Sequence, residues 1–135
     1  MKSSEKLKAY KQSQADYNDA IAIVGNLRNE RVQFGRIDVS SNLSIDASST
    51  ERQVLYALGI LSNQIASCPL LNLPDAEYIE KRDAITAMWK VSQEEKAWAK
   101  YADELRRYTY ELEDLLDNDD KFQLLEYPAK PEQKA

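Results

Sequence analysis

Residues 96–119 have the sequence KAWAKYADELRRYTYELEDLLDND, in which apolar and aromatic residues recur every three or four positions. That spacing predicts an α-helix with one wide apolar face. The centre of this face consists of Trp98, Ala102, Leu105, Thr109, Leu112 and Leu116. Tyr101, Tyr108 and Leu115 flank it, whereas Tyr110 lies off it and is expected to be exposed. We expect the face to pack in a core, and the alternative is a surface that binds a partner.

The same helix is predicted to extend over much of the C-terminal half, because residues 75–118 contain no Gly or Pro. Ser92 and Glu95 have the spacing of a capping box, which marks the start of a helix. Trp89 and Trp98 would lie on opposite faces of an unbroken helix, so either both faces are covered or the helix bends between them. We favour two helices or one bent helix, with the break near Ser92.

Residues 2–32 are predicted to form another helix. Its seam residues follow the 3–4 alternation that is typical of a packed helix. They are Leu7, Tyr10, Gln14, Tyr17, Ile21 and Val24. Gly35 then ends the helical pattern.

A further helix is predicted to begin at Ser48, which has capping-box spacing to Glu51. We expect it to be the most buried helix, and its stripe is Val54, Leu58, Leu61 and Ile65. We expect it to end before the loop CPLLNLP, residues 68–74, because prolines disfavour helix. The leucines expected to fill the core from that loop are Leu70, Leu71 and Leu73.

Between the two helices, apolar and polar residues alternate symmetrically about Ser41. A short hairpin would therefore place Ile37 opposite Ile45 and Val39 opposite Leu43. An isolated hairpin is marginal in water, so it should lie on helices or on a partner. A plain extended loop is the alternative.

Together these elements predict a mainly α fold: a bundle of three to four helices with one long, kinked or broken C-terminal helix and a short β-hairpin at residues 36–46. Residues 1–121 are expected to form a single helical domain. Residues 122–135 contain two prolines and are expected to be an extended tail. Leu124, Leu125 and Tyr127 give that tail apolar side chains that can dock along the bundle.

The absence of histidine restricts the possible functions more than any other feature of the composition. It removes Ser-His and Cys-His catalysis and His-based zinc sites together. Cys68 is the single cysteine and cannot form an internal disulfide, so we expect it to be a small buried residue. We therefore expect no enzymatic activity, no catalytic residue and no cofactor. An enzyme built on carboxylates, lysines or tyrosines is the alternative.

The net charge of −5 is unevenly distributed along the chain, since residues 1–36 carry +3 and the rest −8. An acidic surface argues against direct nucleic-acid binding, which depends on neutralising phosphates. Apolar runs are short, and no apolar segment follows the basic N-terminus as it would in a signal sequence. We expect a cytoplasmic protein with no membrane association.

A run of acids stands at the end of the predicted long helix: Glu111, Glu113, Asp114, Asp117, Asp119 and Asp120. Each exposed acid there is unfavourable by about 0.3–1 kcal/mol, because the helix dipole is already negative at this end. The segment DNDDK, residues 117–121, lacks the glycine of a calcium-binding loop, so we expect no metal site. The acids should pair with the N-terminal lysines (Lys2, Lys6, Lys8 and Lys11) or with a basic partner.

One segment pattern resembles a known family. Trp98, Tyr101 and Leu105 form a W-x-x-Y-x-x-x-L helix motif, and YPAKP follows at residues 127–131. The combination resembles the C-terminal motif of bacteriophage tail fibre assembly chaperones, in which the tail reads W-P-x-x-P. The likeness covers about 35 residues, with Tyr127 in place of Trp and a longer spacer. It implies a small non-enzymatic protein that holds a fibre or tail component during assembly.

We therefore expect an interaction protein, a small helical adaptor or assembly chaperone, that binds a protein partner. The residues expected to contact the partner are Trp98, Tyr101, Leu105, Tyr108 and the six acids named above. A homo-oligomer formed by the long helix is another possible assembly. The alternative function is an acidic inhibitor that mimics nucleic acid and blocks a basic cleft on another protein.

Overall fold

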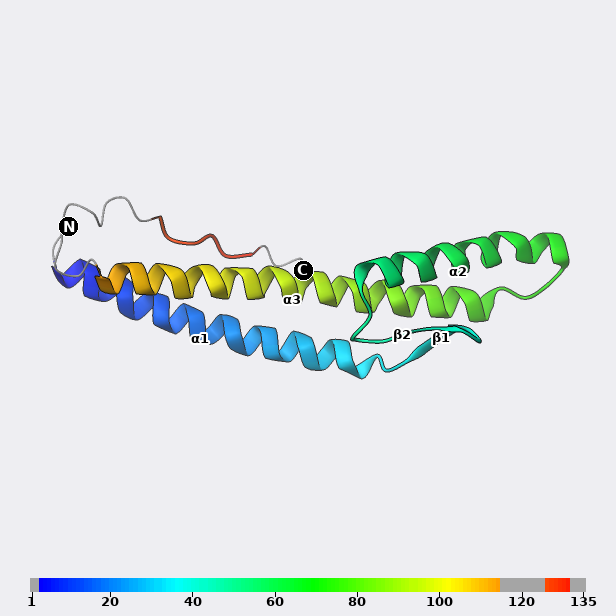
Figure 1. Cartoon of the computed structure of the whole chain (residues 1–135), viewed down its shortest axis with the longest axis horizontal. Helices are drawn as coiled ribbons and strands as arrows, with labels where there is room; N and C mark the ends of the chain where they lie inside the picture. The colour runs from blue at the N-terminus through cyan, green and yellow to red at the C-terminus, as the bar shows by residue number, and fades with distance from the viewer. Residues whose placement is uncertain (1–2, 115–125, 132–135) are drawn as a thin grey trace. The chain divides into compact units, whose positions relative to one another are not determined.

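A computed structural model describes residues 3–114 and 126–131. Within them, three helices and two strands follow in the order α1 (Ser3–Gln33), β1 (Ile37–Ser40), β2 (Leu43–Ile45), α2 (Glu51–Leu71) and α3 (Ala76–Asp114). Figure 1 shows this arrangement. The prediction of a mainly helical chain with one long C-terminal helix and a short hairpin is confirmed.

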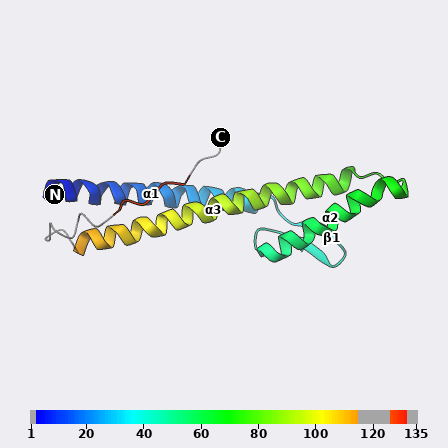
Figure 2. The same ribbon diagram turned by 90° about the horizontal axis from the view of Figure 1, so that it is seen from above.

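The chain divides into two compact units. The helix-pair unit consists of Met1–Asn26 and Glu94–Ala135, and the hairpin unit consists of Leu27–Gln93. In the helix-pair unit, the described parts of α1 and α3 run side by side, as both Figure 1 and Figure 2 show. The hairpin unit contains both strands and all of α2.

The core of the hairpin unit joins the hairpin to α2 and to the first half of α3. Its buried residues are Val39, Ile45, Val54, Ala57, Leu61, Ile85 and Met88. The strands are antiparallel with Ile37 opposite Ile45, as expected, but Leu43 lies opposite Ser40 rather than Val39. A bulge between Asp38 and Ser40 shifts the register, and Val39 is buried in the core.

The start of α2 corrects the predicted cap. Thr50, not Ser48, is the N-cap, because its hydroxyl accepts from the Gln53 amide at 3.3 Å while the Gln53 side chain accepts from the Thr50 amide at 2.8 Å. Ser48 instead donates its amide to the Asp46 carboxylate at 2.8 Å. The Ser48 hydroxyl and amide, in that order of effect, lower the pKa of Asp46.

The end of α2 was predicted too early. The helix continues through Cys68 and Pro69 to Leu71. Pro69 lies in the last turn, and Asn72 closes the helix in the left-handed conformation with φ 54°. The Leu73 amide then donates to the Cys68 carbonyl at 3.0 Å, which is a further bond that satisfies the helix end.

This extension reverses the predicted burial of the leucines near residue 70. Leu70 follows the fully buried Leu61 by nine residues, about half a turn out of phase, so it points away from the core. Leu70, Leu71 and Leu73 are 88%, 64% and 53% exposed and do not fill the core. Cys68 faces inward and is buried, as expected.

The expectation that α2 is the most buried helix is also wrong. Four of the 21 residues of α2 are buried, whereas ten of the 39 residues of α3 are. Leu55 and Tyr56 are exposed, and 22% of the most apolar 18-residue window of α2 is buried. With a mean hydropathy of 1.5 over that window, α2 is long and apolar enough, by length and composition alone, to cross a membrane.

Helix α3 is unbroken from Ala76 to Asp114, so the predicted helix start near Ser92 is not used. Both of its faces are covered instead. Trp89 packs against the core of the hairpin unit, and Trp98 is buried in the helix-pair unit. The opposite orientation of the two tryptophans therefore requires no break.

At three positions of the predicted α1 seam, the buried residue is the one that precedes the predicted residue. Leu7, Gln14 and Ile21 point outward and are exposed. The buried positions are Lys6, Ser13, Ala20 and Val24, with Tyr10 and Tyr17 half-buried. The prediction favoured apolar residues, whereas the buried positions of α1 include the small residues Ser13 and Ala20 and the long side chain of Lys6.

Leu105 is fully buried, so we predict that Leu105→Asp unfolds the helix-pair unit, because an aspartate there would be a buried charge. Leu105→Ala should lower the free energy of unfolding by about 2–5 kcal/mol. The matched control is Tyr110→Asp, since Tyr110 lies on the same helix and is 59% exposed. Urea denaturation followed by circular dichroism measures all three, and equal midpoints for the two aspartate variants would contradict this packing.

Candidate protein-interaction site

Four of the predicted site residues form what we call the α3 aromatic face: Trp98, Tyr101, Leu105 and Tyr108. Each is at most 7% exposed. Trp98 and Tyr101 contact each other edge to face, with 5.7 Å between their ring centroids. The face is thus part of a packed core, and whether it also binds a partner stays a prediction.

Helix α1 covers one side of this face. Ala9 and Tyr10 pack against Tyr108 and Leu112. One helical turn away, the hydroxyls of the buried Ser13 and the half-buried Thr109 connect the two helices. The Thr109 hydroxyl lies 2.8 Å from both the Leu105 carbonyl and Ser13 Oγ, and it donates to one of them at a time.

The other side is covered by residues 126–131, which we call the docked segment. This segment is extended and runs alongside α3 (Figure 1). The Tyr127 ring packs edge to face on Tyr108 at 5.1 Å between centroids, and its hydroxyl donates to the Asp16 carboxylate. Lys130 Nζ lies 5.7 Å from the centre of the Trp98 ring, a cation–π contact.

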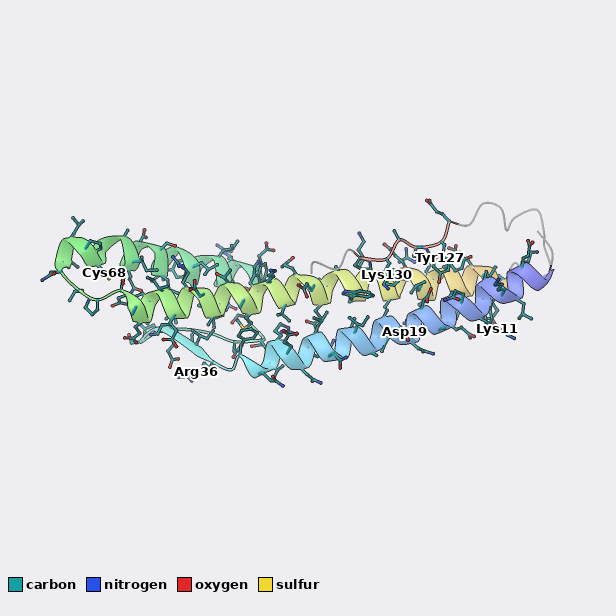
Figure 3. All side chains as sticks on the ribbon, turned by 180° about the vertical axis from the view of Figure 1, so that it is seen from behind. Lys11, Asp19, Arg36, Cys68, Tyr127 and Lys130 are labelled. Carbon is teal, nitrogen blue, oxygen red and sulfur yellow. The ribbon has the colours of Figure 1, made fainter. Side chains whose placement is uncertain are left out.

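The docked segment therefore contacts both ends of the α3 aromatic face, at Trp98 and Tyr108. Figure 3 labels Tyr127 and Lys130 beside α3. Tyr127 is 38% exposed, so the segment lies on the surface of the unit rather than inside it. A cavity of about 450 Å³ remains beside it, between α3 and the segment. Its lining includes Glu104, Arg107, Glu111 and Pro128.

A second cavity, of about 550 Å³, lies along α1 and α3. Its lining includes Tyr10, Gln14 and Tyr17 from α1, together with Arg106 and Tyr110 from α3. The Arg106 guanidinium carbon lies 5.9 Å from the centre of the Tyr110 ring. Tyr110 is exposed, as predicted.

The predicted acidic residues are described only in part. Glu111, Glu113 and Asp114 are exposed in the last turn of α3, which carries no basic residue. Asp117, Asp119 and Asp120 lie outside the described residues, as does Lys2. In residues 3–114 and 126–131, no group of three or more Cys, Asp or Glu side chains is arranged to hold a metal ion. Which positive groups balance these acids stays open.

Sequence reasoning identified Tyr127 as an apolar contact but missed its polar partner. Asp16 is 111 positions away along the chain, and no local pattern marks it. Lys130 was also missed as a contact of Trp98. Its position three residues after Tyr127, in a segment whose prolines favour a polyproline II helix with three residues per turn, was an available signal.

Comparisons with protein-family models, with curated proteins and with solved structures found no match to this chain.

The docking of Tyr127 should be lost in strong alkali. Burial, and then the hydrogen bond and charge of Asp16, raise the pKa of Tyr127 above the ordinary phenol value. Below about pH 10 the phenol is neutral whether docked or released, so docking is unaffected. As the pH rises above about 10, the released phenol ionises first and docking weakens progressively.

Trp98 fluorescence measures this release in a background with Trp89→Phe and Lys130→Arg, because arginine keeps its charge at these pH values. We expect a change in emission above about pH 10. Tyr127→Phe in the same background is the control, since phenylalanine retains the ring contact and cannot ionise. The same alkaline change in the control would contradict the assignment to Tyr127. Burial also raises the pKa of Tyr101 and Tyr108. The test protein and its Tyr127→Phe control both contain these two tyrosines, so the comparison isolates Tyr127.

Proposed function

We propose that this chain is a non-enzymatic interaction protein, a small helical adaptor or assembly chaperone, that binds a protein partner through the α3 aromatic face. The observation that carries the proposal is the docked segment, because the protein's own extended residues 126–131 already lie on that face. A surface that holds one extended peptide offers the contacts needed to hold another.

The contacts define the kind of peptide that would fit. Tyr108 offers a ring for an aromatic residue, Asp16 accepts a hydrogen bond from a hydroxyl, and Trp98 offers its face to a cation. Prolines at 128 and 131 restrict the backbone of the docked segment and reduce the entropy lost on docking. A partner segment with an aromatic residue and a basic residue three positions later would compete for the same contacts.

The resemblance to tail fibre assembly chaperones supports the same reading. It rests on Trp98, Tyr101 and Leu105 of α3 and on Tyr127 and Pro128 of the tail. These two parts of the motif come together in the helix-pair unit through the Tyr108–Tyr127 and Trp98–Lys130 contacts. We propose that the partner is a fibre or tail component held in this way during assembly.

A synthetic peptide of residues 124–133 tests whether the face accepts a peptide supplied in trans. We expect it to bind the Tyr127→Ala protein more tightly than the wild type, because the weakened docked segment no longer competes. A peptide carrying Tyr127→Ala should bind several-fold to about tenfold more weakly, since an aromatic pair contributes about 0.5–1.5 kcal/mol beyond burial. Isothermal titration calorimetry measures the affinities.

The matched control protein is Tyr110→Ala, which removes an exposed tyrosine from the same helix. It should bind the peptide no better than the wild type does. Equal binding of both peptides to all three proteins would contradict recognition at the α3 aromatic face.

The exposed acids favour a second candidate function, an acidic inhibitor of a basic cleft. Glu111, Glu113 and Asp114 present three negative charges in one turn. Binding through these charges should collapse as salt rises, because the Debye length falls from about 10 Å at 0.1 M to about 3 Å at 1 M. Binding through the aromatic face should largely survive. Pull-down of partners from the source cell at low and high salt, with Glu111→Gln and Glu113→Gln as variants, separates the two.

A further inference from the structure

Residues 54–74, which cover most of α2 and the turn after it, contain no Asp, Glu, Lys or Arg. This is an unusual stretch in a chain of which 30% is charged. The core of the hairpin unit uses only one side of the helix, through Val54, Ala57 and Leu61. The uncharged composition of the other side is therefore not explained by folding.

The outward side of α2, which we call the α2 face, is centred on Gly59, Ala66 and Leu70. Ala66 and Leu70 lie about 20° to either side of Gly59 on a helix, and all three lie opposite the buried Leu61. All three are exposed, Leu70 at 88%. Leu55 and Tyr56 flank the centre and are 55% and 65% exposed. Apart from the adjacent residues and the backbone of α2 itself, no atom lies within 4 Å of the position a Cβ would occupy at Gly59, so the face has an open notch there.

We propose that the α2 face binds a second copy of this chain, with the two α2 helices antiparallel across a two-fold axis. Each copy carries a net charge of −5, so contact between most surfaces would bring acids together. The α2 face lets two copies approach without that repulsion. A two-fold interface also needs one patch that complements itself.

Helix spacing provides such self-complementarity. Gly59 and Leu70 are eleven residues apart, which keeps them in line and separates them by about 16 Å. An antiparallel pairing that places Leu70 of each copy over Gly59 of the other satisfies both contacts at once. In that register Asn63 lies opposite Ala66 of the other copy, next to the axis. The side chain exposed at 88% thus enters the notch left by the glycine.

A lipid surface fits the α2 face less well. Crossing a bilayer would remove Val54, Ala57 and Leu61 from the core, where each is at most 2% exposed. Helices that lie on membranes usually carry Lys and Arg on the polar face, and residues 54–74 have none. The net negative charge would also repel anionic lipids.

A single helix pair buries less than the roughly 800 Å² per partner of a standard stable interface, so we expect a dimer that dissociates on dilution. Light scattering coupled to size exclusion, over a wide range of loading concentrations, should show the mass rising towards that of a dimer. Leu70→Lys should weaken association by at least about tenfold, because it buries a charge. Tyr110→Lys, an exposed substitution on α3, should leave it unchanged.

Disulfide trapping tests the antiparallel register. In a Cys68→Ser background, one chain carries Asn63→Cys and a second, mass-tagged chain carries Ala66→Cys. With the two chains in equal amounts, we expect the mixed disulfide to exceed the sum of the two homodisulfides on mild oxidation, because random pairing would make the two equal. Ala22→Cys, exposed on α1, is the control for random collision.

Three results would overturn the proposal. The first is a monomer at every concentration. The second is a mixed disulfide that does not exceed the two homodisulfides taken together, which is the result of random pairing. The third is flotation of the wild type, but not of Leu70→Lys, with vesicles of phosphatidylcholine and phosphatidylglycerol, which would assign the α2 face to lipid.

Discussion

The packing of large α3 side chains against small α1 residues is the constraint on which the helix-pair unit depends. Helices pack about 8–10 Å apart, so bulky residues such as Trp98 and Leu105 need small ones across the interface. Helix α1 contributes Ser13 and Ala20, both fully buried. Because α1 covers only one side of the α3 aromatic face, Tyr101 and Tyr108 need cover from elsewhere. The docked segment provides it through Tyr127.

The polar contacts of this interface decide its register. The Ser13 and Thr109 hydroxyls meet at 2.8 Å, and Ser13 also donates to the Tyr10 carbonyl at 2.8 Å. A slip of α1 along α3 would break the contact between the two hydroxyls, while each keeps a carbonyl of its own helix as acceptor. The cost of the slip is therefore that of one hydrogen bond, about 0.5–1.5 kcal/mol. Apolar packing alone tolerates such slips more easily. The small polar residues therefore specify the alignment that the apolar ones stabilise.

Sequence patterns predicted those parts of the fold in which large apolar residues set the geometry. The stripe from Trp98 to Leu112 is buried as expected. The pattern failed on α1, because Lys6 and Ser13 occupy core positions while the apolar Leu7 lies outside. The face of α1 that is buried is therefore determined by packing against the rest of the fold and not by the hydrophobicity of its residues.

Local rules failed at the ends of α2 for a different reason. Two capping patterns overlap at its start, and the backbone selected Thr50 with Gln53 over Ser48 with Glu51. At its end, Pro69 lacks an amide donor, but the helix continues past it to Leu71. Asn72 then closes the last turn. That single extra turn carries Leu70 outward and creates the exposed apolar surface. The contact between Tyr127 and Asp16 in the candidate site could not be predicted from local sequence patterns either, because the two residues are 111 positions apart.

The two proposed surfaces depend on different forces, and salt should separate them. The docked segment is held by the cation of Lys130 on Trp98 and by the carboxylate of Asp16 in α1 as well as by ring contacts, so ions in solution screen part of its attraction. The α2 face has no charge to screen, and salt reduces the repulsion between two copies of a −5 chain. Rising ionic strength should therefore weaken the first surface only in part, because its ring packing is not screened, while it favours the second. A protein that binds a partner at one unit can, on this reasoning, associate with itself at the other without the two events sharing a single side chain.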